Sequence, residues 1–377
     1  MNGYQIVRRG RGSLAKVPEL ADKLGITRPL IVGSKHLTGA LLKKVPALLA
    51  MPVFSEYHPN PDILDALPAA ELFRKGKCDG IISIGGGSAM DTAKAVKAIL
   101  HAGGPENALA GKYPEKMDTP HLAIPGTAGT GAEATQNAVV YEGITKKSLT
   151  HPDLRPDAVI LDAELLDSLP EYHKKSAALD ALSQGIESYW SRGATEDSRV
   201  NAYLAVLGVL DNLKAYLAGD PHAAEEMLDA SFQSGKAIQV TRTTAAHAMS
   251  YQLTKRLGLA HGHACLVTLP VLWEMMQDRE EMKALLADLS AKMRLSDPQM
   301  VPKLLRGILY DLEMEIPPMP DPETLETLVS SVDPNRLGNH PVEMKEDEIR
   351  AAYRRAFTPL CAAERQACLD IWTYYCK

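Results

Sequence analysis

Short apolar runs alternate with stretches of helical spacing over the first 165 residues. Five runs predict strands, at Pro29–Gly33, Met51–Phe54, Gly80–Ile84, His121–Ile124 and Ala158–Leu161. Between them, apolar positions recur every three to four residues and predict helices, at Leu37–Leu48, Asp62–Lys75 and Ser88–His101. Residues 136–142 and 148–150 could add a hairpin. This alternation is typical of a parallel sheet with helices on both faces.

The pattern changes after Pro170, where only long helical windows follow. They lie at Lys174–Trp190, Glu196–Leu217, His222–Thr244, Leu266–Arg279, Arg279–Lys292, Pro302–Leu312, Pro322–Val332 and from Lys345 onward. The proline-rich segment Pro317–Pro322 predicts a loop. We therefore expect two domains, an α/β domain over residues 1–165 and an all-α domain over residues 166–377.

Composition narrows the class of protein. The 377 residues are 45% hydrophobic and 23% charged, with a formal charge of −6, so two soluble domains fit and no basic face suggests nucleic acid. No apolar run reaches the roughly 18–20 residues of a membrane span, and no signal peptide is evident. The five widely spaced cysteines favour reduced thiols rather than a disulfide framework. We expect a cytoplasmic protein without a membrane partner.

A glycine-rich segment follows the third predicted strand, in I-I-S-I-G-G-G-S-A-M-D. Glycines let a backbone approach a ligand closely, and the free N–H groups of the following helix favour a phosphate. Gly86, Gly87 and Ser88 are therefore candidates to cradle a pyrophosphate. The alternative is a tight strand-to-helix turn without a ligand, because the spacing is not that of an ordinary dinucleotide fingerprint.

A second small-residue loop follows the fourth predicted strand, in A-I-P-G-T-A-G-T-G-A-E-A-T. Thr127, Thr130 and Gly131 could line the same cofactor cleft, although a simple turn is the alternative. Two such loops after two strands favour a shared cofactor site, because ligands of open parallel sheets bind at the carboxyl ends of the strands.

Candidate metal ligands are concentrated between residues 177 and 270. Asp180 and Gln184 are four residues apart on a predicted helix, so their side chains share one face. His247 and His261 follow in T-T-A-A-H-A-M-S-Y and H-G-H-A. Carboxylates and imidazoles are ligands for divalent metals. Each residue alone would more often be structural, and the set is less specific than H-E-x-x-H.

Five motifs together resemble the metal-dependent (iron-containing, group III) alcohol dehydrogenases, in the right order and over nearly the whole chain. They are G-G-G-S-A-M-D-T-A-K, P-G-T-A-G-T-G-A-E, L-D-A-L-S-Q-G-I-E, T-T-A-A-H-A-M-S-Y and L-A-H-G-H-A. The resemblance implies a dinucleotide-binding α/β domain, a helical domain, a cleft between them and a homodimer. It assigns Asp180, Gln184, His247 and His261 to the ligands of Fe²⁺ or Zn²⁺, with Mn²⁺ as a further option, and includes Asp91 among the cofactor-site candidates.

Three positions depart from the family pattern. Gln184 stands where the family usually has His, and an amide oxygen is a harder and weaker donor than imidazole. Tyr251 stands where a second His often follows the one at His247, and could replace it as a hydrogen-bond donor. His263 is an added imidazole that could be a ligand, a proton relay or a substrate contact; a packed histidine is the alternative.

These departures lie in three of four motifs, D-A-L-S-Q-x-I-E-S-Y-W-S, T-R-T-T-A-A-H-A-M-S-Y, H-G-H-A and R-L-G-N-H-P. Together the four motifs resemble the phosphonoacetaldehyde reductase-like branch, whose members reduce a two-carbon aldehyde carrying a phosphonate; sulfoacetaldehyde is the sulfonate analogue. A small anionic aldehyde needs a fixed cation. Arg242, five residues before His247, is the leading candidate, and Arg336 and His340 are weaker ones. A salt bridge on a helix surface or between the domains is the alternative for Arg242.

The resemblance also bears on the nicotinamide cofactor. The family often has an Asp after the first of these strands, and here Ser34 and Lys35 occupy that region. Loss of an acid and gain of a cation permit NADPH as well as NADH. Asn60 could also contact the cofactor. Lys147 matches a family position near it, with Lys146 as a competitor.

The expected activity is hydride transfer from NAD(P)H to a carbonyl polarised by the metal, with His263 or Tyr251 assisting proton delivery. The main rival is a simple alcohol or polyol dehydrogenase on the same scaffold. Glycerol dehydrogenase and dehydroquinate synthase resemble this architecture, but the basic residues expected for the synthase's phosphorylated substrate are lacking. A non-catalytic cofactor-binding relative with a decayed metal site is the remaining alternative.

Overall fold

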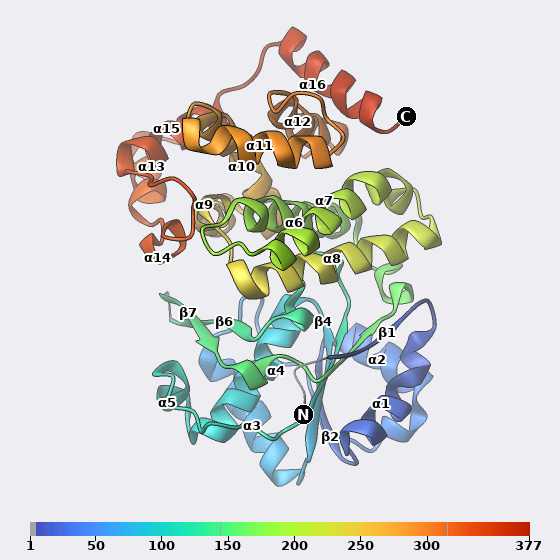
Figure 1. The fold of residues 1–377 in the computed structure, drawn as a ribbon. Helices are drawn as coiled ribbons and strands as arrows, with labels where there is room; N and C mark the ends of the chain where they lie inside the picture. The colour runs from blue at the N-terminus through green and yellow to red at the C-terminus, as the bar shows by residue number, and fades with distance from the viewer. Residues whose placement is uncertain (1–4, 144, 315) are drawn as a thin grey trace. The chain divides into compact units, whose positions relative to one another are not determined.

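The computed structural model describes residues 5–143, 145–314 and 316–377. The chain forms two compact units (Figure 1). One comprises Met1–Leu169 with Ala218–Gly235, and the other comprises Pro170–Leu217 with Lys236–Lys377. The functional boundary expected after residue 165 stays a prediction.

The first unit contains a six-stranded parallel sheet. Its strand order is β1 (Ile6–Arg9), β8 (Ala158–Leu161), β5 (His121–Pro125), β4 (Gly80–Gly85), β2 (Pro29–Gly33) and β3 (Val53–Phe54). All five neighbouring pairs are parallel. The expected parallel α/β fold is therefore confirmed. The additional strand β1 lies at the sheet edge, where its arginines interrupt the apolar pattern that marks the buried strands.

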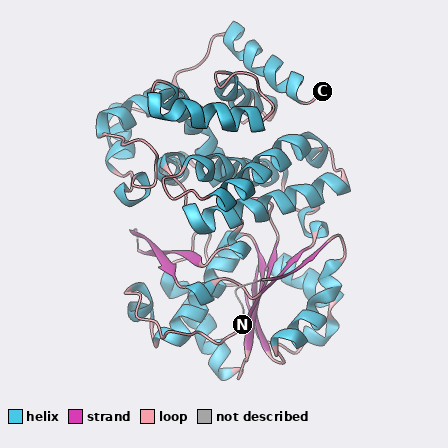
Figure 2. Ribbon diagram, viewed as in Figure 1, coloured by secondary structure: helices cyan, strands magenta, loops and turns pink. Residues whose placement is uncertain are grey.

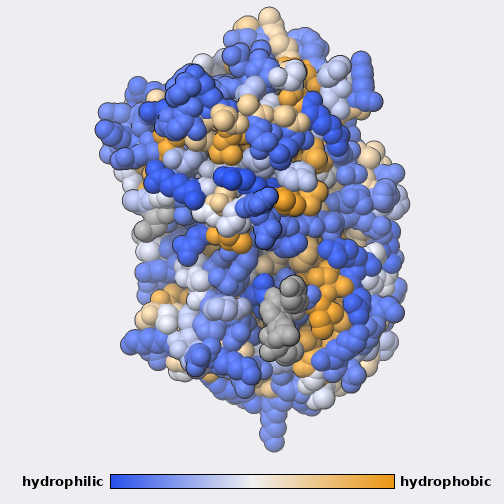
Figure 3. Space-filling model, in the orientation of Figure 1, coloured by the Kyte–Doolittle hydropathy of each residue, from blue (hydrophilic) through white to orange (hydrophobic). Residues whose placement is uncertain are grey.

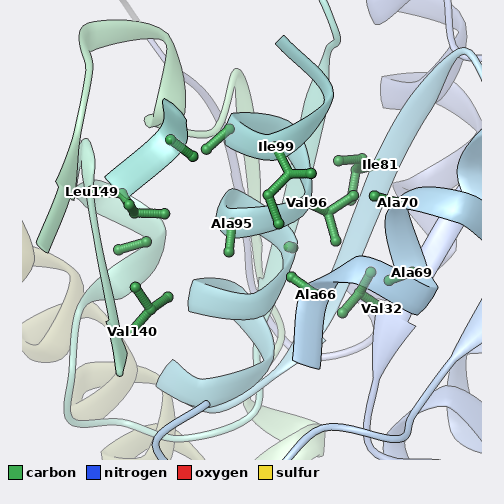
Figure 4. Close-up of a cluster of buried hydrophobic side chains, with 14 of the residues drawn as sticks. Val32, Ala66, Ala69, Ala70, Ile81, Ala95, Val96, Ile99, Val140 and Leu149 are labelled. Atoms are coloured by element: carbon green, nitrogen blue, oxygen red, sulfur yellow. The ribbon is translucent and has the colours of Figure 1, made fainter. Parts of the chain in front are cut away.

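Helices cover both faces of this sheet (Figure 1). Alternate residues of β2 divide between two cores, because successive side chains of a strand point to opposite faces. Ile31 packs with α1 (Val17–Leu24) and α2 (Lys35–Lys44). Leu30 and Val32 pack with α3 (Ala66–Lys75), α4 (Gly87–Ala102) and α5 (Pro105–Leu109), in the cluster drawn in Figure 4.

Two predicted helices in this unit are shorter than expected. The first ends at Lys44, and a 3-10 turn over Pro46–Leu48 follows because proline cannot continue the hydrogen-bond ladder. The second begins as a 3-10 turn over Ile63–Asp65, capped by the Asp62 side chain, before α3.

The predicted hairpin is confirmed as β6 (Asn137–Glu142) paired antiparallel with β7 (Thr145–Thr150). The buried Lys94 of α4 forms hydrogen bonds with the segment that leads into this hairpin. Its ammonium group donates to the carbonyl oxygens of Ala132, Thr135 and Asn137 at 2.7 to 2.8 Å. A buried ammonium group requires such partners, so Lys94 ties the end of the second small-residue loop to the helix that follows the first loop.

The second unit is helical, and the described residues from 166 onward contain no strand (Figure 2). Its helices are α6 (Glu171–Trp190), α7 (Glu196–Leu217), α9 (Ala245–Leu257), α10 (His261–Gln277), α11 (Glu280–Lys292), α12 (Met300–Asp311), α13 (Pro322–Ser330), α14 (Pro334–Leu337), α15 (Glu346–Phe357) and α16 (Ala362–Tyr375). Helix α8 (Pro221–Thr241) begins in the first unit and ends in the second.

Several helix ends in this unit differ from the sequence prediction. The window expected over 222–244 ends at Thr241, because Arg242 takes a left-handed conformation with φ of 56°. Helix α10 begins at His261, five residues earlier than expected. The window from Lys345 onward is broken near Pro359, which divides it into α15 and α16. The loop expected at Pro317–Pro322 is confirmed up to the start of α13.

The face shown in Figure 3 is mainly hydrophilic, with hydrophobic residues in separate patches. None of the helices in the described part of the chain is long and apolar enough to cross a bilayer.

Candidate metal centre and cofactor loops

Four side chains of the helical unit bring potential metal donors together. They are Asp180 on α6, His247 on α9, and His261 and Cys265 on the first two turns of α10. One donor atom from each lies within 4.8 Å of the others. Asp180, His247 and Cys265 are buried, whereas the His261 side chain is 39% exposed. Three members of the group are therefore enclosed, and His261 is its accessible member.

A glycine allows α10 to approach α6 closely enough for this grouping. A Cβ atom on Gly262 would lie 2.0 Å from the carbonyl oxygen of Ser176 and 2.5 Å from the backbone nitrogen of Asp180. Such distances exclude any side chain at this position. The glycine of the H-G-H-A segment therefore sets the distance between the two helices, and with it the distance between His261 and Asp180.

Glu187 orients the imidazole of His247. It lies fully buried on α6, seven residues after Asp180 and on the same face. One of its oxygens accepts hydrogen bonds from the Thr244 hydroxyl and the Ala246 amide, both at 2.7 Å, and the other contacts Nδ1 of His247. With Nδ1 donating to this carboxylate, Nε2 faces Asp180, whose Oδ1 is 3.2 Å away, and Nε2 is the nitrogen that could bind a metal once it loses its proton.

Sequence reasoning missed Glu187, although its spacing from Asp180 was a usable signal. Burial by itself would raise the pKa of Glu187, but His247 and the hydrogen bonds from Thr244 and Ala246 outweigh burial and lower it. The carboxylate is therefore ionised, as a partner of a metal-bound imidazole should be.

Gln184 lies beside Asp180, one turn further along α6. It is buried, and its amide nitrogen donates to Oδ1 of Asp180 at 3.2 Å. The side chain is therefore at the position that the family resemblance indicates, but its amide hydrogen faces the carboxylate. Whether its amide oxygen also ligates a metal stays a prediction.

The residues present fit a divalent metal. Carboxylate, imidazole and thiolate are the donor types that Zn²⁺ and related ions take, and donors this close together can share one ion. Burial would lower the pKa of His247, but Cys265, Glu187 and Asp180 outweigh burial and raise that pKa well above its usual range. A cation at this position is thus electrostatically favoured, and a bound metal would take the place of the proton.

An aromatic and cationic layer adjoins the exposed side of the group. The Tyr251 ring stacks parallel to His261, with centroids 6.0 Å apart, and the Arg336 guanidinium lies 5.5 Å from the centre of the Tyr251 ring. Arg336 also donates to the Thr243 hydroxyl at 2.8 Å. Burial raises the pKa of Tyr251 to about 12, so its phenol stays protonated and can donate.

The other sequence candidates lie in different surroundings. Arg242 is exposed and directly precedes Thr243. His340 is buried edge-to-face against Trp190, and burial lowers its pKa to about 4, so it carries no charge at neutral pH. His263 is buried, and its Nδ1 lies 3.2 Å from the Tyr172 hydroxyl. The catalytic roles expected for Arg242 and His263 stay predictions.

In the first unit, the two small-residue loops contact each other after β4 and β5. A Cβ atom on Gly86 would lie 3.2 Å from the Thr127 methyl group, and one on Gly87 would lie 3.1 Å from the Thr130 methyl group. The Ser88 hydroxyl accepts the backbone N–H of Asn60 at 3.2 Å. Five of the candidate cofactor residues and Asn60 are thus brought together at the start of α4.

The remaining cofactor candidates lie on three elements of the same unit. Ser34 caps α2 by accepting the Leu37 amide at 3.3 Å, and the exposed Lys35 pairs with Glu56 at 2.9 Å. Lys147 on β7 pairs with Glu142 at 3.5 Å. Asp91 lies on α4, and burial raises its pKa to about 6, against the opposing effect of Lys94.

Two family models match most of the chain. The model for iron-containing alcohol dehydrogenase matches residues 5–163, and the C-terminal model of the Fe-containing alcohol dehydrogenase family matches residues 175–357. A phosphonoacetaldehyde reductase of Streptomyces viridochromogenes is 37% identical over 274 residues, covering 68% of this chain and 67% of the relative. A lactaldehyde reductase of Escherichia coli is 31% identical over 277 residues, covering 69% and 71%.

Solved structures agree with these sequence relatives. A sulfoacetaldehyde reductase from Bifidobacterium kashiwanohense, in complex with NAD⁺, superposes with a TM-score of 0.87 at 27% identity, covering 94% of this chain and 97% of the other. An iron-containing alcohol dehydrogenase from Thermotoga maritima gives a TM-score of 0.82 at 28% identity, covering 94% and 98%. These findings confirm the resemblance that the sequence motifs indicate.

Proposed function

Because this chain belongs to the iron-containing alcohol dehydrogenase family, we propose that it reduces a small anionic aldehyde to the alcohol with NAD(P)H. The substrate is of the phosphonoacetaldehyde or sulfoacetaldehyde type. Support comes from the two relatives named for such substrates, one by sequence and one by fold. The lactaldehyde reductase relative supports an uncharged short aldehyde as the second candidate.

The helical unit supplies the groups that act on the carbonyl. When bound, the nicotinamide supplies a hydride and the divalent metal acts as a Lewis acid toward the carbonyl. Asp180, His247 and His261 would hold the metal, and Glu187 keeps His247 in the tautomer that a metal needs. The exposed edge of His261 is the side from which a substrate can approach.

The proton for the alkoxide has a candidate donor in Tyr251. Burial keeps its phenol protonated, and its ring stacks on His261, the accessible member of the donor group. A neutral phenol can donate a hydrogen bond to a developing alkoxide, directly or through water. His263 contacts Tyr172 instead, which favours a supporting role for it.

The position of Arg336 is the observation that best supports an anionic substrate. Its guanidinium lies over the Tyr251 ring, which stacks on His261, so a fixed cation lies one aromatic ring away from a candidate metal ligand. Guanidinium groups bind phosphonate and sulfonate oxygens in a bidentate manner. We therefore propose Arg336 as the anion anchor alongside Arg242, which the sequence had favoured.

A kinetic panel tests the substrate class. Phosphonoacetaldehyde, sulfoacetaldehyde, succinic semialdehyde and lactaldehyde would be compared by kcat/KM with NADPH and with NADH. We expect an anionic two-carbon aldehyde to exceed lactaldehyde by at least about tenfold, equivalent to about 1.4 kcal/mol of transition-state binding. Equal or better turnover of lactaldehyde would contradict the anionic substrate class.

Paired variants separate the two anchors. Arg336→Ala should raise KM for the best anionic aldehyde at least about tenfold and leave that for lactaldehyde nearly unchanged. Arg242→Ala is measured beside it, and Arg256→Ala, which removes an exposed arginine of α9, controls for net charge. If all three variants keep wild-type KM for the anionic aldehyde, neither arginine is the anchor.

A further inference from the structure

We propose that the metal is ligated by the thiolate of Cys265, which takes the place of Gln184 as the fourth ligand. This inference rests on the proposed metal-dependent function and concerns the same site. It differs from the ligand set that the family motifs indicate, because position 265 is outside that set and would otherwise pass as a buried structural cysteine.

The position of Cys265 on α10 carries the inference. Cys265 is four residues after His261, so both side chains project from one face of the helix. Its sulfur belongs to the group in which the donor atoms lie within 4.8 Å of one another. The thiol is fully buried and lies beside the His247 imidazole and the Ser250 hydroxyl.

Gln184 is the weaker choice for the fourth donor. Its amide N–H already serves Asp180 as a hydrogen-bond donor, and an amide oxygen is uncharged and hard. A thiolate adds a second negative charge to that of Asp180. Together they neutralise a divalent cation in a buried site, where an uncompensated charge is costly. Gln184 then acts as a positioning residue that orients the Asp180 carboxylate.

A second buried cysteine illustrates the alternative role, in which a buried thiol only packs and binds no metal. Cys368 on α16 is also buried, and its backbone carbonyl packs against Gly307 of α12. Among the described residues, Cys368 belongs to no group of potential metal donors. It is therefore a matched control for a buried thiol whose role is packing alone.

The ligand set predicts a metal preference. Thiolates favour Zn²⁺ and the spectroscopic substitute Co²⁺, whereas Mn²⁺ prefers oxygen donors. We therefore expect the purified protein to retain Zn²⁺ more tightly than Mn²⁺. A site built with a third imidazole or an amide in place of sulfur would discriminate less.

X-ray absorption on the zinc-loaded full chain tests the ligand directly. We expect one sulfur scatterer at about 2.3 Å beside nitrogen and oxygen scatterers at about 2.0–2.2 Å. The measurement requires no variant and no substrate. A spectrum fitted by nitrogen and oxygen alone would overturn the proposal while leaving the proposed reductase function intact.

Cobalt-substituted variants provide the second test. The wild type should show thiolate-to-cobalt charge-transfer absorption in the near ultraviolet at one equivalent of metal. Cys265→Ser should abolish this band, whereas Cys368→Ser and Gln184→Ala should keep it. Cys265→Ser should also weaken Zn²⁺ binding. The loss should exceed the roughly 10–100-fold that is typical when a residue hydrogen-bonded to a metal ligand is removed.

The outcomes distinguish the two proposals. A band that survives in Cys265→Ser overturns the thiolate ligand, even if turnover of anionic aldehydes is confirmed. A wild-type protein that takes up neither Zn²⁺ nor Co²⁺ overturns both the ligand and the metal-assisted reaction. Normal metal uptake with the sulfur signal but without turnover of any aldehyde leaves the ligand supported and contradicts the function.

Discussion

Glu187 holds Nδ1 of His247 inside the helical unit, and this contact decides which nitrogen the imidazole presents to Asp180. The same carboxylate accepts the Thr244 hydroxyl and the Ala246 amide, so it also secures the first turn of α9. A single buried acid thus sets both the tautomer of His247 and the position of the helix that carries it.

Glu187→Gln should weaken metal binding by roughly 10–100-fold, because an amide holds the imidazole less firmly and does not raise its basicity. Zn²⁺ affinity measured by competition with a chelator checks this. The control is Glu171→Gln, which alters an exposed acid at the start of the same helix. Equal Zn²⁺ affinity in both variants would show that Glu187 has no part in the site.

Gly262→Ala should separate α10 from α6, because the added Cβ would meet the Ser176 carbonyl and the backbone of Asp180. Overpacking of this kind destabilises proteins by about 1–3 kcal/mol. The free energy of unfolding in urea and the Zn²⁺ affinity should both fall. Gly39→Ala is the matched control, since a Cβ there meets open space in α2. A Gly262→Ala protein of wild-type stability and affinity is incompatible with the close approach.

Ser34→Asp should shift the cofactor preference toward NADH. Aspartate also caps helices well, so α2 should remain intact while an acid is restored near the proposed ribose site. We expect the NADPH:NADH ratio of kcat/KM to fall at least about tenfold, about 1.4 kcal/mol.

Lys35→Ala gives the matching test of the cation, and the same ratio should fall without any new negative charge. Far-UV circular dichroism serves as the control for folding in both variants. An unchanged ratio in both would place the 2′-phosphate elsewhere and remove Ser34 and Lys35 from the cofactor site.

His340 should make the protein less stable in mild acid. In the unfolded chain a histidine takes up a proton near pH 6.5, whereas burial delays protonation of His340 in the folded protein to about pH 4. The unfolded state therefore binds more protons between these values, and stability is lost as pH falls from about 6.5 to about 4. The loss is of the order of 3 kcal/mol and levels off below pH 4.

The measurement is the free energy of unfolding across pH 4 to 7 for the wild type and for His340→Gln. The difference between the two profiles should shrink as pH falls, because only the wild type loses the contribution of a neutral buried imidazole. His222→Gln, which changes an exposed histidine at the start of α8, should run parallel to the wild type. A His340→Gln profile that also runs parallel would contradict the argument.

The parallel sheet and most helices could be predicted from the sequence, because their apolar periodicity follows directly from burial. Strand β1 could not, since Arg8 and Arg9 hide an edge strand whose partner is about 150 residues away. The early start of α10 was missed because His261, Gly262 and His263 give no apolar period, although the helix needs Gly262 for its approach to α6.

The candidate site, like the fold, could be predicted from the sequence only in part. Asp180, His247 and His261 could be found from motifs, and the structure brings them together. Glu187 and Cys265 were overlooked because no motif assigns them a role. The cysteines had been considered only as disulfide candidates or structural thiols. Spacing along one helix places Glu187 on the face of Asp180 and Cys265 on the face of His261, but which of these side chains meets a donor group depends on how three helices pack.

The close contact at Gly262 has a thermodynamic consequence for the metal. Since α6 and α10 are held together by backbone packing, the donors on both helices are in place before any ion arrives. Loading should then require little ordering entropy, and the exchange of metal should depend mainly on removing water from the incoming ion and a proton from the site. Thermal unfolding would reveal this as a metal-free form that still unfolds cooperatively, unlike zinc fingers, which need the ion to fold at all.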